Sequence, residues 1–228
     1  MSRFGRLFPA IAVLAVIAGA SATARADTIF IVGNSTNQAA TATVVCEFNS
    51  QTNTLTFTIT NTSAITQPGS TSTITGIGFD LPPTGNASPS GLNGFTGQQA
   101  PSLGSTFDFS DADLGNVPQF NNVVLDFGFT TGPSGNFSGG SVNDGLLPGE
   151  SASFTVTGAA FSGFTESQIC NAIFVRFQNI TTAQGQGSDV GVPGITPSEI
   201  PEPSTILLLG SALVGFGGFA RRKFKTRN

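Results

Sequence analysis

The sequence of 228 residues contains no histidine, no tryptophan and no tyrosine, and only two cysteines. The absence of histidine excludes a Ser-His-Asp triad, a Cys-His pair and a histidine-ligated zinc ion. A free catalytic thiol is also disfavoured, since no histidine can serve as its base. The absence of tryptophan and tyrosine removes the rings on which sugars stack best. We therefore expect that the chain is not an enzyme and has no resident cofactor.

Positive charge is almost absent from the central part of the chain. Between Asp27 and Ile200, 12 Asp and Glu residues face a single cation, Arg176, which gives a net charge of −11. The other Lys and Arg residues lie in the two terminal segments. This distribution excludes nucleic acid as a partner, because cations are needed to displace phosphate counterions. It is the asymmetry expected of an exported body between two basic, membrane-flanking ends.

The N-terminal segment has the pattern of a secretory signal peptide. Arg3 and Arg6 precede an apolar stretch over Leu7–Ala20, and the small-residue site Ala24-Arg25-Ala26 follows. We predict a signal peptide over residues 1–26, with cleavage between Ala26 and Asp27. An uncleaved membrane anchor is the alternative.

The C-terminal segment combines an apolar run with a basic end. Thr205–Ala220 is 16 residues without a charge, about 24 Å of helix, which is short for a membrane span. The basic residues of 221–228 can extend to the lipid headgroups and offset part of the mismatch. We predict a single transmembrane helix over 205–220 and a cytoplasmic basic tail over 221–228; a buried core helix is the alternative.

The same segment resembles the PEP-CTERM sorting signal of bacterial envelope proteins. The resemblance rests on Pro201, Glu202 and Pro203, on the glycine-containing apolar helix, and on Arg221, Arg222 and Lys223. It implies export through the inner membrane and processing by an exosortase. The chain would be membrane-anchored before processing and located at the cell surface or in the extracellular matrix afterwards. The resemblance covers residues 200–228 and implies nothing about the fold of the preceding body.

The body is predicted to be all-β. Thr54–Thr60 alternates Leu, Phe and Ile with threonine, which is typical of a half-buried antiparallel strand. Five further segments have similar patterns: Ala42–Phe48, Ile74–Leu81, Val123–Phe129, Ala152–Thr157 and Ala172–Gln178. Six or more short strands favour an antiparallel β-sandwich-like ectodomain over 27–183, and a barrel or an irregular stack of strands is the alternative.

The remaining segments are predicted to be turns, loops and one short helix. Pro82–Gly104 and Thr130–Gly145 are rich in Gly, Pro, Ser and Asn, which indicates surface loops. Residues 184–199 have the same character and predict a linker between the ectodomain and the sorting signal. A helix is predicted only around Thr165–Asn171, with Thr165 as its cap.

The two cysteines, Cys46 and Cys170, are predicted to form a disulfide, as expected in an exported protein. The bond would close a loop of more than 100 residues. On the chain-entropy model, such a loop stabilises the fold by about 4 to 5 kcal/mol. The bond would connect the first hairpin to the last strands.

Carboxylates are the remaining candidates for chemistry. Two acids facing each other across a sugar suffice for glycoside hydrolysis, and Asp108, Asp111, Asp113 and Asp126 are the candidates by clustering. Calcium binding by Asp108, Asp111 and Asp113 is the second hypothesis, since calcium prefers hard oxygen ligands. The spacing does not match an EF-hand, because Gly115 and Asn122 stand where ligands should be.

Arg176 is predicted to pair with a carboxylate and fix packing, with an acidic-sugar clamp as the alternative. The leading interpretation of the whole chain is a structural surface or matrix protein associated with exopolysaccharide. Two alternatives remain: a glycan-binding module, assisted by calcium, and a carboxylate-only hydrolase.

Overall fold

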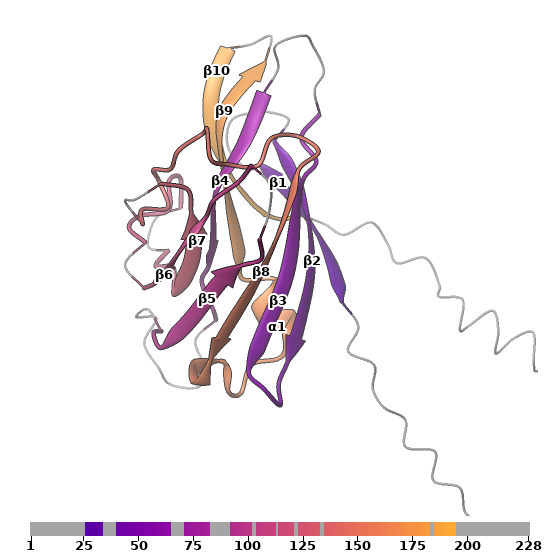
Figure 1. The fold of residues 1–228 in the computed structure, drawn as a ribbon, viewed down its shortest axis with the longest axis vertical. Coiled ribbons are helices and arrows are strands. Elements are labelled where there is room, and N and C mark those ends of the chain that lie inside the picture. Colours follow the sequence, from indigo (N-terminus) through magenta and orange to yellow (C-terminus); the bar gives the residue numbers. More distant parts are fainter. Residues whose placement is uncertain are drawn as a thin grey trace, which may run out of the picture.

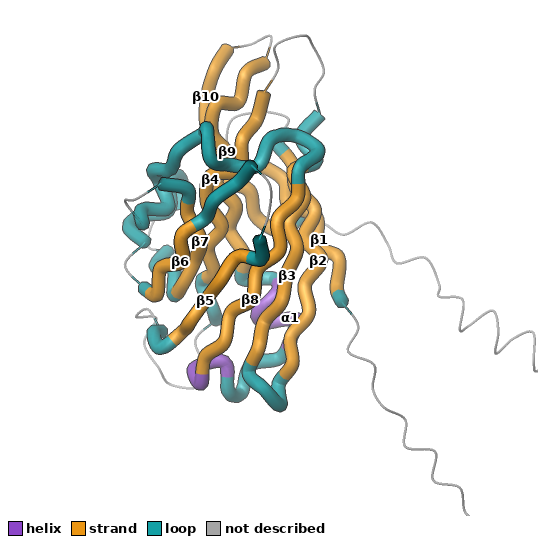
Figure 2. The backbone as a smooth tube through the Cα atoms, in the orientation of Figure 1, coloured by secondary structure: helices purple, strands orange, loops and turns teal. Residues whose placement is uncertain are grey.

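The computed structural model describes residues 26–33, 40–64, 71–82, 92–101, 104–112, 114–120, 123–132, 135–182 and 185–194. Within these ranges the chain forms ten strands, one short α-helix and one 3-10 turn (Figures 1 and 2). The strands are β1 (Asp27–Gly33), β2 (Thr41–Asn49), β3 (Thr54–Asn61), β4 (Thr71–Phe79), β5 (Phe95–Gln99), β6 (Asp108–Asp111), β7 (Phe127–Thr130), β8 (Ser151–Gly158), β9 (Ile173–Thr182) and β10 (Gly185–Pro193). The helix α1 is Glu166–Cys170, and the 3-10 turn is Ala159–Phe161.

The strands form one antiparallel sheet with the order β5-β8-β3-β2-β1-β10-β9-β4-β7-β6. The sheet curls until its two edge strands, β5 and β6, face each other (Figure 1). A Cβ atom on Gly97 of β5 would lie 2.2 Å from Cδ2 of Phe109 in β6, so the glycine makes room for the ring. The all-β prediction is confirmed. The two-layered sandwich is corrected to a nearly closed barrel, since alternating strands predict both architectures equally well.

Apolar and polar side chains alternate along the strands, and many of the side chains that point into the interior are phenylalanines. Along β3 the side chains of Leu55, Phe57 and Ile59 are buried, whereas the threonines between them point outward. Phe57 stacks on Phe154 of the neighbouring strand β8, with ring centroids 5.0 Å apart. It also contacts Phe79 of β4 from across the interior, at 5.3 Å. The six predicted strand segments are confirmed, although β7 begins only at Phe127.

Strand β10 corrects the predicted domain boundary. Residues 184–199 were expected to be a linker, but Gly185–Pro193 lies in the sheet between β1 and β9. Gly191 pairs with both neighbours, and a Cβ atom there would lie 2.6 Å from Ile31 Cγ2 and 2.9 Å from Phe177 Cε2. The glycine therefore permits close packing in a strand, and the folded body extends to Pro193 instead of ending at 183.

The two predicted loops have different outcomes. Pro82–Gly104 contains the strand β5 within its described part, so the prediction of a surface loop is wrong for that strand. Thr130–Gly145 has no strand after Thr130 in the residues described there. Its Phe137 is nevertheless fully buried and belongs to a second apolar cluster, separate from the main core, with Leu114, Val117, Leu125 and Val190.

Both terminal predictions fall on residues that are not described. The predicted signal peptide covers residues that are not described except Ala26, which is exposed, and Asp27 then opens β1. The predicted transmembrane helix 205–220 and the basic tail 221–228 lie outside the described residues. Among the residues that are described, no helix has the length and apolar character needed to cross a membrane. The cleavage site and the transmembrane helix therefore remain predictions.

Candidate functional site

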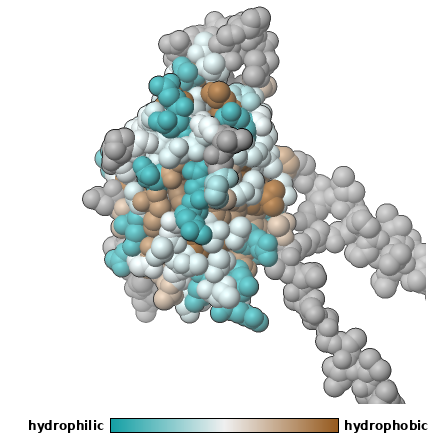
Figure 3. All heavy atoms as spheres, viewed as in Figure 1, coloured by the Kyte–Doolittle hydropathy of each residue, from teal (hydrophilic) through white to brown (hydrophobic). Residues whose placement is uncertain are grey.

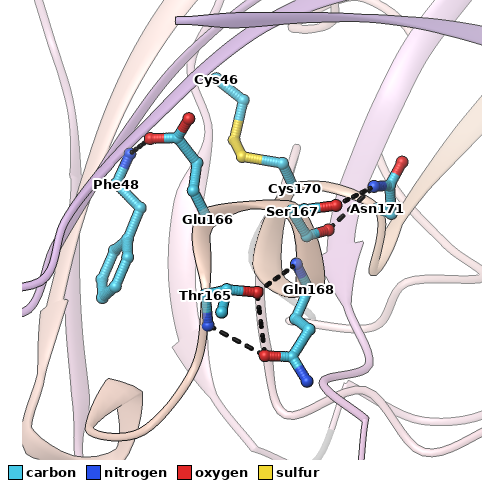
Figure 4. The surroundings of a disulfide bond; sticks show 8 residues. All are labelled: Cys46, Phe48, Thr165, Glu166, Ser167, Gln168, Cys170 and Asn171. Atoms are coloured by element: carbon cyan, nitrogen blue, oxygen red, sulfur yellow. Dashed lines mark hydrogen bonds between the residues drawn. A yellow bond between two sulfur atoms is a disulfide. The ribbon is translucent and has the colours of Figure 1, made fainter. Parts of the chain in front are cut away.

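The disulfide between Cys46 and Cys170 joins β2 to α1, as Figure 4 shows. The two Cα atoms are 6.0 Å apart, and 124 positions separate the cysteines in the sequence. Both cysteines are buried at 1% exposure. The predicted pairing is therefore present in the structure, and it ties the first hairpin to the segment that leads into β9.

The short helix α1 is fixed at both of its ends. Thr165 and Gln168 form a reciprocal capping box, in which Thr165 Oγ1 accepts from the Gln168 amide and Gln168 Oε1 accepts from the Thr165 amide (Figure 4). Glu166 Oε2 accepts a hydrogen bond from the Phe48 amide at 2.8 Å. At the C-terminal end, Asn171 Nδ2 donates to the Ser167 carbonyl at 2.8 Å. The predicted helix and its Thr165 cap are confirmed, and the Glu166 contact is an additional link to β2.

Asp126 connects three segments of the chain. It lies just before β7 and is 4% exposed. Its Oδ2 atom accepts from the Leu81 amide at 2.7 Å, and its Oδ1 atom accepts from the Leu92 amide. Its backbone carbonyl accepts from the Ala112 amide at 2.8 Å. The two carboxylate oxygens therefore bind backbone amides near the two ends of the connection between β4 and β5.

Asp111 makes a similar connection at the edge of the sheet. This last residue of β6 accepts from the Gly94 amide at Oδ2, at 2.9 Å, and from the Phe95 amide at Oδ1, at 3.2 Å. Phe95 begins β5, so the carboxylate links the two edge strands. We call Asp111 and Asp126 together the carboxylate latch.

The structure does not bring the predicted calcium ligands together. Asp108 and Asp111 lie at opposite ends of β6, paired with Thr130 and Phe127. Their separation of three residues directs the side chains to opposite faces of the strand. Asp113 is outside the described residues. Over the described ranges, no group of three or more His, Cys, Asp or Glu is arranged to hold a metal ion.

The carboxylates that do influence each other are Asp80 and Asp126. Burial raises the pKa of Asp126, while the hydrogen bonds from the Leu81 and Leu92 amides act in the opposite direction. Burial also raises the pKa of half-buried Asp80, and the charge of Asp126 raises it further. Among the acids predicted for hydrolysis, only Asp126 belongs to this pair. Both of its oxygens are already bound to amides, which leaves it poorly placed for proton transfer to a substrate.

Arg176 is 6% exposed, so it is inaccessible to a polymer on the surface. It lies on β9 next to Gly76 of β4, where an added Cβ atom would be 3.2 Å from Arg176 Cβ and 3.3 Å from Phe137 Cδ2. Its Nη2 atom donates to Ser188 Oγ at 3.0 Å, and its Nη1 atom donates to the Asp189 carbonyl at 3.4 Å. Burial lowers the pKa of the guanidinium, and the charge of Asp189 partly offsets this effect. Arg176 thus links β9 to β10.

Comparison with known proteins identifies the C-terminal tail but not the body. Residues 199–223 match the family model of the PEP-CTERM protein-sorting motif. This tail is a PEP-CTERM sorting signal. No curated protein and no solved structure matches the chain. The motif therefore identifies where the protein goes, and the interpretation of the body depends on its own structure.

The sorting signal makes the chain an exported protein that an exosortase processes, with a location at the surface or outside the cell. The matched region contains every predicted motif residue, Pro201, Glu202, Pro203, Arg221, Arg222 and Lys223. These residues lie outside the described part of the structure.

Sequence reasoning missed the connecting role of the aspartates. In the sequence, Asp126 is a candidate for hydrolysis and Asp111 a candidate for hydrolysis or calcium binding, while their amide partners lie 34 and 17 positions away. Asp80 was not singled out at all. No local pattern predicts such contacts, since they depend on how the sheet curls.

Proposed function

We propose that this chain is a non-enzymatic structural protein of the cell surface or extracellular matrix, which associates with exopolysaccharide after exosortase processing. The PEP-CTERM match over residues 199–223 carries the proposal, because it assigns export and processing. The predicted membrane helix holds the precursor until the tail is processed. The folded body is then the part presented outside the cell.

The body has features that suit a durable extracellular protein. The buried disulfide closes a long loop, and it forms under the oxidising conditions outside the cytoplasm. Asp111 and Asp126, two of the acids considered for catalysis, bind backbone amides instead. This use of the carboxylates favours a structural role over a carboxylate-only hydrolase.

The test follows the full-length chain in the producing cells. Pro201, Glu202 and Pro203 are replaced together by alanine, and Pro197→Ala, just outside the matched residues, is the matched control. We expect the wild type and the control in the surface and matrix fractions, and the triple variant retained in the membrane fraction. Enzymatic removal of the exopolysaccharide should release the wild type from the matrix. Wild-type protein in the cytoplasm, or equal distribution of all three chains, would contradict the proposal.

A further inference from the structure

The outward surface of β3 and β8 is an array of hydroxyl groups. β3 directs four threonines outward, Thr54, Thr56, Thr58 and Thr60. β8 directs two serines and two threonines outward, Ser151, Ser153, Thr155 and Thr157. The two sets lie opposite each other in register, and we call them the hydroxyl face. Figure 3 shows pale side chains of intermediate hydropathy over these strands, which lie at the front of the view in Figure 1.

The spacing of the hydroxyl face is periodic in two directions. Neighbouring strands lie about 4.8 Å apart, and outward residues on one strand lie about 6.8 Å apart. Thr58 and Ser153 form a hydroxyl pair at 2.7 Å, as do Thr60 and Ser151. In each pair only one hydroxyl donates to the other, so one O–H donor and several lone pairs remain for a ligand.

One row of this array ends in an exposed aromatic ring. The register places Ser151 beside Thr60, Thr60 beside Thr43 of β2, and Thr43 beside Phe30 of β1. Phe30 is 40% exposed, although most large apolar side chains of the described body are buried. The row of four crosses four strands and spans about 14 Å at the usual strand spacing. The row combines hydroxyl groups, which can exchange hydrogen bonds with sugar hydroxyls, with an apolar ring.

The charge of the body selects among polysaccharides. All eight outward side chains of the hydroxyl face are uncharged, and Glu47 of β2 lies at its border beside Thr56. The segment from Asp27 to Ile200 carries a net charge of −11, and its single cation, Arg176, is buried. This segment would repel an acidic polymer and offers it no accessible cation. A neutral polymer meets neither obstacle.

We infer that the hydroxyl face, with Phe30 at its end, is a docking surface for a neutral polysaccharide chain. The polysaccharide crosses the strands along the row from Ser151 to Phe30. It exchanges hydrogen bonds with the hydroxyl groups of the protein and places one sugar ring against the phenyl ring of Phe30. The inference rests on the proposed function and names the polymer class and the surface. A second copy of this chain is a poorer occupant, because the centre of a protein interface is usually apolar and well packed.

The test measures retention of the full-length chain, in detergent, on cellulose and dextran as neutral probes and on alginate as an acidic one. The double variant T60V/S151A removes both partners of one hydroxyl pair, a change that is nearly neutral for stability. F30L removes the ring but keeps an apolar side chain, and T106V removes an exposed threonine hydroxyl elsewhere. We expect wild type and T106V to bind a neutral probe saturably and independently of salt. T60V/S151A and F30L should each bind about tenfold more weakly, the effect of one or two lost contacts.

Several outcomes would overturn the inference. These are equal binding by all four chains, stronger retention on alginate than on the neutral probes, or self-association that depends on the hydroxyl face without polysaccharide binding. A parallel measurement uses the producing cells' own exopolysaccharide. If it retains the wild type and both variants equally, the docking surface is wrong and the proposed function stands. If it does not retain the wild type, the proposed association with exopolysaccharide fails as well.

Discussion

Two regions of the molecule join segments that are distant in sequence, and they do so by different chemistry. Away from the sheet edges, the disulfide between Cys46 and Cys170 connects the interior strand β2 to α1. At the sheet edges, the carboxylate latch of Asp111 and Asp126 binds four backbone amides between Leu81 and Phe95. The covalent bond restricts the unfolded chain, whereas the latch stabilises the folded chain alone.

This difference separates the conditions that act on each region. A reductant breaks the disulfide and leaves the carboxylates unchanged. Protonation of Asp126, whose pKa is raised by burial, changes the latch and leaves the disulfide unchanged. The pH response of Asp126 therefore tests the latch separately from the disulfide.

The largest effect is expected from the disulfide. Replacing Cys46 and Cys170 by serine should lower the free energy of unfolding by about 4 to 5 kcal/mol, because the loop of 124 positions regains its freedom in the unfolded chain. Urea unfolding with and without reductant measures this change. Reductant should destabilise the wild type by a similar amount and leave the double variant unchanged. An unchanged wild type would show that the bond does not restrict the unfolded chain.

The next largest effect is expected at the latch. Asp126→Ala leaves the amides of Leu81 and Leu92 without their acceptor. Two lost charge-assisted hydrogen bonds should cost about 3 kcal/mol, in part offset because the buried charge is also removed. Asp144→Ala, at an exposed position, is the control. Hydrogen exchange should show faster exchange at Leu81 and Leu92 in the variant. Equal protection of these amides in wild type and variant would contradict the latch.

A smaller effect is expected where the edge strands meet. Gly97→Ala places a Cβ atom 2.2 Å from the ring of Phe109, so the ring must move. Phe109 is half-buried and can yield, which suggests a loss of about 1 to 2 kcal/mol. The second change F109L should recover part of the loss in the double variant. Purely additive effects in urea unfolding would show that the two positions do not interact.

The sequence predicted features that depend on local pattern. The alternation of Leu55, Phe57 and Ile59 predicted β3, and Thr165 predicted the start of α1. The cysteine pairing was predicted because an exported chain has two cysteines and one way to join them. Each of these inferences needs only neighbouring residues or a count.

The features that were missed depend on how distant segments meet. The segment of β10 is predicted to be a linker because glycine is common in loops. In the structure, Gly191 lies in a strand, where Ile31 and Phe177 approach so closely that there is no room for a Cβ atom. The latch could not be predicted, because its aspartates find their amide partners only when segments distant in sequence fold together. The curl of the sheet also decides between barrel and sandwich, and the alternation within single strands carries no information about it.

The smallest effect concerns the response to pH. The pKa values of Asp80 and Asp126 are raised above 3.8 by burial, and that of Asp80 also by the charge of Asp126. A carboxyl with a raised pKa binds its proton more tightly in the folded chain than in the unfolded chain. Its contribution to stability therefore increases as the pH falls from neutral through the raised pKa towards 3.8, and is constant and lower above that window.

Asp80→Asn removes the group whose pKa is raised both by burial and by the charge of Asp126. We expect the free energy of unfolding of D80N to exceed that of the wild type at neutral pH, and the difference to shrink as the pH falls towards 3.8. Urea unfolding at a series of pH values measures the difference, with the exposed Asp144→Asn as the control. A pH-independent difference between D80N and wild type would mean that Asp80 titrates alike in the folded and unfolded chains. The Asp80–Asp126 pair would then give the latch no pH response that the disulfide region lacks.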